Sequence, residues 1–367
     1  MTGVLVHEWI AQSGGSENVL QAFAELYPAA DIVCLWNEST GRFDPERLQE
    51  SWLARSPLRH QRALALPLMP AVWRRRRNRG YDWALISSHL FAHHVRFRDQ
   101  PPDFERFVYV HTPARYIWAP EQDARGGNPF VRVAAEAFKP LDRHRAHESG
   151  HYAANSEFIR SRLTDCWGVD SEVIYPPVDV SGIQSVTDWR EHLAPAETAV
   201  LADLPADFFL GASRFIPYKR LDLVIRTAEL AGRPVVLAGR GPERARLEQR
   251  AAEASVPVHF VEHPSRALLY ALYQQAALYV FPAVEDFGIM PVEAMAAGTA
   301  VLAQRLGGTA ETVVSGVSGA LSDFRSDQEM REAAEQAMSA PRAARAAHAQ
   351  RFSLERFREE VIAWTGR

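Results

Sequence analysis

FPAVEDFGIMPVEAMAAG, residues 281 to 298, is the most informative stretch of the chain. An apolar run typical of a buried strand ends at Phe281, and a helix is predicted from about Met290. The loop between them carries Glu285 and Gly288. A buried strand followed by a short loop and a helix indicates a βα unit of a parallel sheet.

The loop is suited to bind an anion and a sugar. Gly288 lets the backbone approach a ligand where the free N–H groups and the dipole of the helix favour negative charge. Glu285 projects from the loop and Glu293 from the first turn of the helix, and carboxylates accept paired hydrogen bonds from ribose or hexose hydroxyls. Alternatively, both glutamates only complement the helix N-terminus. That alternative explains Glu293 alone but not the whole loop.

A second strand-to-helix loop is GASRFIPYKRLD, residues 211 to 222. Its two cations, Arg214 and Lys219, can clamp a diphosphate, arginine by its planar fork and lysine as a point charge. They would also stabilise the charge that develops on a departing nucleoside diphosphate. The alternative is a pair of solvated loop cations, which is how most such residues occur.

A third loop is IAQSGGSENVL, residues 10 to 20, in which Gly14 and Gly15 precede a predicted helix. It lacks both the G-x-G-x-x-G pattern and the lysine of a P-loop, which argues against a dinucleotide or ATP site. A Gly-Gly turn at a helix start can still admit a phosphate or a sugar.

Apolar strand-like runs alternate with helical patterns throughout the chain, so an α/β fold with parallel sheets is predicted. The best linker candidate is YPPVDV, residues 175 to 180, because its paired prolines disfavour both helix and central strand. We therefore expect an N-terminal Rossmann-like domain over 1–178, a second one over 179–350, and a C-terminal helix over 351–367. The site is expected in the cleft between the domains. The predicted strands cover residues 3–6, 31–36, 83–86, 107–111, 152–155, 172–175, 207–211, 234–238, 258–261, 277–281 and 300–302.

Composition excludes several classes of protein. With 367 residues and 47% hydrophobic residues, the chain can form two buried cores and is too apolar for disorder. A net charge of −4 gives no overall reason to bind nucleic acid. The two cysteines, Cys34 and Cys166, are far apart, which argues against a disulfide scaffold. We expect no signal peptide and no membrane span, hence a cytoplasmic protein.

Together these segments resemble the retaining glycosyltransferases of family 4, which have the GT-B fold. The family's Glu-x7-Glu motif is matched by Glu285 and Glu293 within EDFGIMPVEAMAAGTAVLA. Further likeness lies in SRFIPYKRLDLVI, LAGRGPE, LGGTAETVVSGVSGAL and HEWIAQSGGSENVL, the last with Ser16 where the family usually has alanine. The resemblance implies two Rossmann-like domains that face each other across a cleft, with the C-terminal helix returning to the N-terminal domain.

The resemblance also implies a role for each matched residue. Arg214 and Lys219 would hold the donor diphosphate, and Glu293 the ribose hydroxyls. The catalytic residues would be Glu285, which contacts the donor sugar near its 3-hydroxyl, His111, which faces that sugar from the N-terminal domain, Arg214 and Lys219. The donor-binding residues would be Gly14, Gly15, Arg214, Lys219, Glu285, Phe287, Gly288, Ile289 and Glu293.

A narrower resemblance concerns the donor. YDWALISSHLFAHHV (residues 81–95) and VYVHTPARYIWAP (residues 108–120) are similar to bacterial O-antigen and polysaccharide mannosyltransferases that use GDP-mannose. Ala119 departs from the usual aspartate of that subgroup. The expected activity is transfer of mannose from GDP-mannose to a glycan or a lipid-linked acceptor. Alternatives are a UDP-sugar-dependent transferase acting on a lipid or a small natural product, a nucleotide-sugar epimerase, and a binding protein without activity.

No cofactor or metal ion is expected. The chain has no Asp-x-Asp metal motif, and the two loop cations can neutralise the leaving group instead. In the mechanism that the resemblance implies, the acceptor hydroxyl gives its proton to the departing phosphate, so no protein nucleophile is needed. His89, His93 and His94 are interpreted as structural or acceptor-cleft histidines rather than metal ligands.

One basic stretch, Arg74 to Arg79, is a candidate for peripheral contact with the inner face of the plasma membrane. It follows apolar residues and Trp73, and it contains five arginines. The alternative of equal weight is a solvated helix end, because four consecutive arginines cannot share one helix face. Nucleic-acid binding is not expected, since the patch is single and lacks interleaved aromatics.

Overall fold

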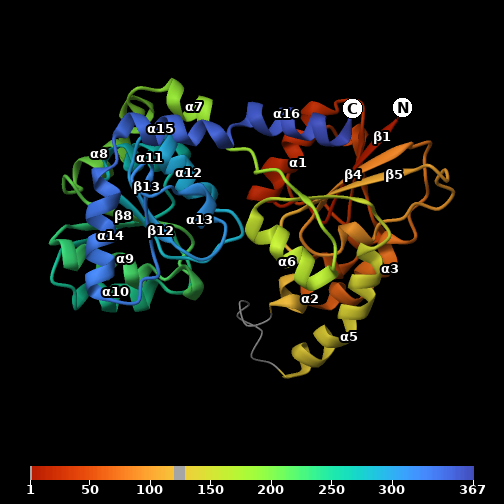
Figure 1. The fold of residues 1–367 in the computed structure, drawn as a ribbon, viewed down its shortest axis with the longest axis horizontal. Helices are drawn as coiled ribbons and strands as arrows, with labels where there is room; N and C mark the ends of the chain where they lie inside the picture. The colour runs from red at the N-terminus through yellow and green to blue at the C-terminus, as the bar shows by residue number, and fades with distance from the viewer. Residues whose placement is uncertain (1, 120–128) are drawn as a thin grey trace. The chain divides into compact units, whose positions relative to one another are not determined.

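The computed structural model describes residues 2–119 and 129–367 and divides into two compact units (Figure 1). Unit 1 comprises Met1–Pro177 and Phe357–Arg367, and unit 2 comprises Val178–Arg356. The chain first passes between the units within the predicted linker. Among the described residues, no helix has both the length and the apolar character to cross a bilayer.

Unit 1 contains a seven-stranded parallel sheet in the order β3-β2-β1-β4-β5-β6-β7. Its central strands are buried along their length, because helices cover both faces of such a sheet. The strands are β1 Gly3–His7, β2 Asp31–Cys34, β3 Leu48–Glu50, β4 Trp83–Ser88, β5 Glu105–Val110, β6 His151–Ala154 and β7 Glu172–Val173. The α-helices are α1 Gly15–Leu26, α2 Arg62–Ala65, α3 Met69–Trp73, α4 Arg115–Trp118, α5 Pro129–Ala146 and α6 Glu157–Trp167.

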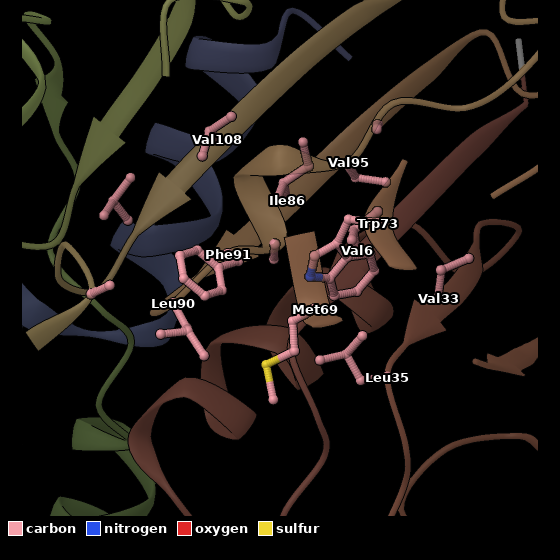
Figure 2. Close-up of a cluster of buried hydrophobic side chains, with 14 of the residues drawn as sticks. Val6, Val33, Leu35, Met69, Trp73, Ile86, Leu90, Phe91, Val95 and Val108 are labelled. Carbon is pink, nitrogen blue, oxygen red and sulfur yellow. The ribbon is translucent and has the colours of Figure 1, made fainter. Parts of the chain in front are cut away.

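The core of unit 1 forms where β-branched side chains of adjacent strands meet larger side chains from the connections. Figure 2 shows Val6 of β1, Ile86 of β4 and Val108 of β5 in the same cluster as Met69 and Trp73 of α3. Trp73 is completely buried. Burial of each such large apolar side chain stabilises the unit by roughly 1.5–3 kcal/mol.

Unit 2 contains a six-stranded parallel sheet in the order β10-β9-β8-β11-β12-β13. Its strands are β8 Phe209–Ala212, β9 Val235–Ala238, β10 Val258–Val261, β11 Leu278–Phe281, β12 Val301–Gln304 and β13 Gly319–Ser322. The α-helices are α7 Val180–Ser185, α8 Pro195–Ala202, α9 Leu221–Ala231, α10 Arg244–Ala252, α11 Arg266–Gln275, α12 Ile289–Ala296, α13 Thr309–Thr312, α14 Asp327–Ser339 and α15 Arg342–Ala349.

The predicted α/β class with parallel sheets is confirmed. All eleven predicted strands are present, each with both ends within two residues of the observed bounds. The sequence analysis missed β3 and β13, which lie at the edges of the two sheets. β3 has the sequence LQE and β13 the sequence GALS, so each has one large apolar residue and lacks the apolar run by which a parallel strand is recognised. The edge strand β10, with the sequence VHFV, was found.

The last helix, α16 (Leu354–Thr365), returns to unit 1 as predicted and lies beside α1 (Figure 1). Ser353 caps it by accepting a hydrogen bond from the N–H of Arg356. Phe357 is 1% exposed and stacks on Phe23 with a ring separation of 5.5 Å. The hydroxyls of Tyr27 and Thr365 are 2.8 Å apart. Helix α16 is therefore held on unit 1 by apolar packing and by a polar contact.

The basic stretch Arg74 to Arg79 is partly internal. Arg74 forms a bidentate ion pair with Glu148, with N–O distances of 2.6 and 2.7 Å. Arg76 donates to the carbonyl oxygen of Cys34 over 2.6 Å, which covers the end of β2. The side chains of Arg75, Arg77 and Arg79 are exposed. A membrane contact at this stretch would therefore rest on three of its five arginines.

We predict that Phe357→Ala destabilises unit 1 by about 3 kcal/mol, because it leaves a cavity beneath α16. The measurement is denaturant unfolding followed by circular dichroism, reported for the transition of unit 1. Ile362→Ala is the matched control on the same helix, since Ile362 is 44% exposed, and it should change the unfolding free energy by less than ~0.5 kcal/mol. Equal effects of the two substitutions would contradict the packing of α16 on unit 1 through Phe357.

Candidate functional site

Each sheet has one position at which the strand order reverses. In unit 2 the chain adds β9 and β10 on one side of β8 and then returns to place β11 on the other. In unit 1 the same reversal lies between β1 and β4. Connections leave these two strands toward opposite faces, so a crevice opens at their carboxyl ends, where ligands of α/β proteins bind.

In unit 2 the loops after β8 and β11 bring Lys219 and Glu285 together. Lys219 ends a 3₁₀ turn, Pro217–Lys219, and its ammonium nitrogen lies 2.5 Å from Oε1 of Glu285. The two residues are 66 positions apart in the chain. Lys219 is only 9% exposed, and its ammonium also lies 5.1 Å from the ring centre of Phe281. A nearly buried cation is thus fixed beside a carboxylate at the reversal point.

Arg214, the other predicted cation, lies in the same loop as Lys219 but is exposed. The loop backbone around it is ordered by the N–H of Ile216, which donates to the carbonyl oxygen of Arg214 over 3.0 Å. An exposed guanidinium next to a buried ammonium offers two different contacts to a diphosphate.

The loop that carries Glu285 is supported from behind by the Gly307–Gly308 turn. The N–H of Gly308 donates to the carbonyl oxygen of Glu285 over 2.8 Å. A side chain at Gly308 would approach the carbonyl oxygen of Asp286 to 2.3 Å, so only glycine permits this contact. Gly288 has a φ of +101°, a left-handed conformation that ends the loop and starts α12. The first N–H groups of α12 then follow directly on Gly288, as the sequence predicted.

Glu293 lies on α12, and its carboxyl group has an unusual pKa. This pKa is raised to about 7 mainly by burial, with the charge of Arg266 lowering it and that of Asp179 raising it. Within residues 2–119 and 129–367, no hydrogen bond to this carboxylate is found. It is therefore free to accept hydrogen bonds from ligand hydroxyls, which would favour its ionised form.

In unit 1, three polar side chains meet at the carboxyl ends of β1, β4 and β5. The hydroxyl of Ser87 lies 3.0 Å from Nδ1 of His7 and 2.8 Å from Nε2 of His111. Burial, together with the nearby His7, lowers the pKa of His111 to about 3. The predicted residue His111 is therefore a neutral imidazole at pH 7, held in one orientation by Ser87.

The Gly14–Gly15 loop is shaped by a buried carboxylate. Glu17 accepts hydrogen bonds from the N–H of Ala11 at 3.1 Å and the hydroxyl of Ser16 at 2.9 Å. A side chain at Gly14 would collide with this carboxylate at 2.2 Å. The Glu17 carboxylate thus packs against Gly14, and the loop lies in unit 1 with His111.

His93 and His94 lie beside Asp142, a carboxylate that the sequence did not place near them, and the three side chains each offer one ligand atom within 4.8 Å of the others. Their role as structural or acceptor-cleft histidines stays a prediction. Both are buried, and Nε2 of His94 lies 2.9 Å from Oδ1 of Asp142, with Nε2 of His93 at 3.2 Å. Burial and the neighbouring His93 lower the pKa of His94 to about 4. The other oxygen of Asp142 accepts the indole N–H groups of Trp118 and Trp167, each at 2.7 Å. The two indole N–H groups therefore stabilise this buried carboxylate.

Trp118 precedes Ala119, the position at which the sequence departs from the mannosyltransferase pattern. Its indole is one of the donors to Asp142, so the departure occurs beside a structural hydrogen-bond network. Pro120, the last residue of that pattern, lies outside the described residues. His89 is separate from the network: its ring lies 5.5 Å from that of His7 and 6.3 Å from that of His111.

His7, Ser87 and Glu17 were not recognised from the sequence. His7 and Ser87 end or nearly end two strands that lie next to each other in the sheet, and His111 follows the third. This placement at the ends of adjacent parallel strands could have identified the first two. Glu17 gave no comparable indication, because an acidic residue in a first helical turn is ordinary.

Comparison with known proteins finds a family match that includes the loops of unit 2. Residues 199–352 match the family model of the glycosyl transferases group 1. The matched segment lies within unit 2. The match includes the predicted residues Arg214, Lys219, Glu285 and Glu293.

Two curated relatives come from Mycolicibacterium smegmatis. A D-inositol 3-phosphate glycosyltransferase is 33% identical over 189 residues, which are 48% of this chain and 42% of the relative. A GDP-mannose-dependent alpha-(1-6)-phosphatidylinositol monomannoside mannosyltransferase is 29% identical over 183 residues, 46% of this chain and 47% of the relative. The chain thus spans less than half the length of these relatives.

Solved structures extend the likeness in fold to the whole chain. HepE of Anabaena in complex with UDP-glucose has a TM-score of 0.70 at 18% identity, with 99% of each chain covered. Sucrose-phosphate synthase of Thermosynechococcus elongatus also has a TM-score of 0.70, at 17% identity, with 98% and 97% covered. With its two Rossmann-like units, the chain has the predicted GT-B fold.

We predict that Glu293 makes stability depend on pH. Between pH 5 and 8 the folded state keeps a proton that the unfolded state has lost, so raising the pH lowers the unfolding free energy. At ~1.4 kcal/mol per pKa unit, the unfolding free energy of Glu293→Gln relative to that of the wild type should increase by about 2 kcal/mol from pH 5 to pH 8. Denaturant unfolding of both proteins at pH 5, 6, 7 and 8 measures this gain.

Glu335→Gln, at an exposed glutamate of α14, is the matched control and should leave the pH profile of the wild type unchanged. A constant difference between Glu293→Gln and the wild type across this range would contradict a raised pKa at Glu293.

Proposed function

We propose that the protein is a retaining glycosyltransferase that transfers a hexose from a nucleotide sugar. The observation that carries the proposal is the Lys219–Glu285 pair at the reversal point of the unit 2 sheet, within the matched domain. A cation for the diphosphate and a carboxylate for the sugar lie side by side there, as the chemistry of such a donor requires.

The proposed donor is GDP-mannose. Support comes from the likeness of residues 81–95 and 108–120 to GDP-mannose-dependent enzymes and from one relative whose name includes GDP-mannose. The competing donor is a UDP sugar, favoured by the bound UDP-glucose of HepE. The proposed acceptor is a hydroxyl of a glycan or lipid-linked sugar, and the name of the mannosyltransferase relative includes a lipid acceptor.

In the proposed transfer, a bond forms between the acceptor oxygen and the anomeric carbon on the face from which the diphosphate leaves. The bond from that carbon to the diphosphate oxygen breaks, and the acceptor proton passes to the leaving diphosphate. Lys219 and Arg214 would stabilise the developing negative charge. Glu285 would orient the sugar, Glu293 would accept the ribose hydroxyls, and the amides of Phe287, Gly288 and Ile289 would lie against the sugar and phosphate. Contacts of His111, Gly14 and Gly15 with the donor stay predictions, as does independence from a metal ion.

The first experiment is a calorimetric titration of the purified protein with GDP-mannose, GDP, UDP-glucose, UDP-GlcNAc and UDP, without added metal. Tighter binding of the guanosine ligands would support GDP-mannose, and tighter binding of the uridine ligands would replace the donor while keeping the reaction. The absence of binding to all five would overturn the proposed site.

The lysine content permits a direct test of where the nucleotide binds. Lys139 and Lys219 are the only lysines among the 41 basic residues. An amine-reactive reagent followed by peptide mass spectrometry can therefore report on Lys219 with Lys139 as an internal reference. The nucleotide that binds in the titration should slow the modification of Lys219 and leave Lys139 unchanged. Equal protection of the two would contradict the diphosphate role of Lys219.

We predict that Lys219→Ala and Glu285→Ala each lower turnover by about 10²–10³-fold while the fold survives, because each removes an electrostatic contact to the donor. Initial rates with the donor identified by titration measure the loss, and circular dichroism checks the fold. Arg220→Ala is the matched control: Arg220 is adjacent to Lys219 but pairs with Asp222 on the surface and should keep its rate. Rates near the wild type in either site variant would contradict the assignment.

A further inference from the structure

Unit 1 contains a buried group of three side chains that can act as metal ligands and that the proposed function does not use. His93 and His94 end the 3₁₀ turn Ala92–His94, which follows β4, and Asp142 lies near the end of α5. Each of the three is at most 1% exposed, and each offers one ligand atom within 4.8 Å of the others. We call this group the His93–His94–Asp142 triad.

The carboxylate of the triad is a buried charge without a cationic side chain beside it. Its Oδ2 accepts the indole N–H groups of Trp118 and Trp167, as described above. Its Oδ1 lies 2.9 Å from Nε2 of His94 and 3.2 Å from Nε2 of His93. Within the described part of the chain, no lysine or arginine forms an ion pair with Asp142. A buried carboxylate of this kind is stabilised by any cation that can reach its free side.

The hydrogen bonds of Ser88 determine which nitrogen of His93 carries the proton. The hydroxyl of Ser88 donates to Oε1 of Glu8 over 3.4 Å, so toward His93 its oxygen can only accept. It accepts the backbone N–H of His93 at 3.4 Å and lies 3.2 Å from Nδ1 of the same residue. Nδ1 therefore carries the proton, and the neutral ring presents the lone pair of Nε2 on the side of Asp142.

Nε2 of His93 and Oδ1 of Asp142 are then two acceptors close together, and they require a cation between them. A proton does not meet this need, because Nε2 of His93 lies near Oδ1 but is not oriented to form a hydrogen bond with it. Ligands of one metal ion show this arrangement, since each lone pair points at the ion rather than at the other ligand. With bonds of about 2.0–2.1 Å, ligand atoms of a tetrahedral zinc ion lie about 3.3 Å apart. The two printed triad distances, 2.9 and 3.2 Å, are close to that spacing.

The ligand atoms determine which kind of ion fits. Two imidazole nitrogens and one carboxylate oxygen suit Zn²⁺ or a similar divalent transition metal, whereas Ca²⁺ and Mg²⁺ prefer oxygen ligands throughout. The surrounding contacts also suit a metal site, because Ser88 orients the ring of His93 and the two indoles orient Asp142. The ring of Trp167 lies 4.4 Å from that of His93 and forms an apolar wall beside the triad.

We propose that the His93–His94–Asp142 triad binds a divalent transition-metal ion, which links the end of β4 to α5. The two histidines are then structural residues that act as metal ligands, which replaces their interpretation from the sequence. The ion would stabilise unit 1 and take no part in transfer, so this proposal does not rest on the proposed function.

The first test uses the wild-type full chain, produced in zinc-supplemented medium and purified without a chelator. Elemental analysis should find about one zinc ion per chain. X-ray absorption at the zinc edge should show only nitrogen and oxygen neighbours. A sulfur neighbour would overturn the proposal, because it would assign the ion to Cys34 or Cys166. Protein purified free of zinc would overturn it as well.

Two variants test the ligands. Asp142→Asn keeps an acceptor for the indoles but removes the charge, and His93→Gln removes the imidazole. Each should weaken zinc binding at least about 100-fold in competition with a chromophoric chelator. His144→Gln is the matched control, because this histidine lies on α5 like Asp142 but its side chain is 75% exposed, and it should bind zinc as the wild type does.

Zinc should also raise the thermal unfolding midpoint of the wild type and of His144→Gln, but not that of the two ligand variants. Equal zinc binding and equal thermal shifts in all four proteins would overturn the proposal. Nucleotide titration of the zinc-loaded wild type reports separately on the proposed function: its failure would leave the metal site standing, and loss of zinc binding would leave the donor site standing.

Discussion

The parallel arrangement of the strands is the constraint on which the other features depend. Because all strands of a sheet point the same way, every loop that follows a strand emerges at one edge. Reversal of strand order then leaves two neighbouring loops without a helix packed between them. In unit 2 these are the loops after β8 and β11, and they hold Lys219 and Glu285. In unit 1 the same geometry brings His7 and Ser87 together with His111.

The loop that carries Glu285 is supported both by a close backbone contact and by side-chain packing. Gly308 presses against the 285–287 backbone, where any side chain would collide. Phe287 is buried and packs edge-on against Phe352 at 5.6 Å. The backbone of Glu285 is therefore held in place, and its carboxylate contacts Lys219. Such prior ordering lowers the entropy that a ligand would otherwise lose on binding.

The sequence predicted the fold and the unit 2 site better than the unit 1 site, and the reason is physical. Central parallel strands are buried on both faces and form continuous apolar runs, so they were found, whereas β3 (LQE) and β13 (GALS), which have one large apolar residue each, were not. Glu285, Gly288 and Glu293 lie within one short segment that can be recognised locally.

The unit 1 cluster joins residues separated by 80 and 24 positions, and no local pattern marks them. The basic stretch shows the same limit. Composition alone could not reveal that Arg74 meets Glu148, 74 positions away, whereas Arg75 stays exposed. A site within one short segment can be recognised from the sequence, whereas a site formed by distant segments can be recognised only once the order of the strands is known.

The two units differ in charge at the positions where the strand order reverses. In unit 1 burial keeps His111 neutral, so it can orient a hydroxyl but cannot balance a diphosphate. In unit 2 Lys219 pairs with Glu285 and Arg214 is exposed in the same loop, so under the proposed function the positive charge for a leaving diphosphate would come from unit 2 alone.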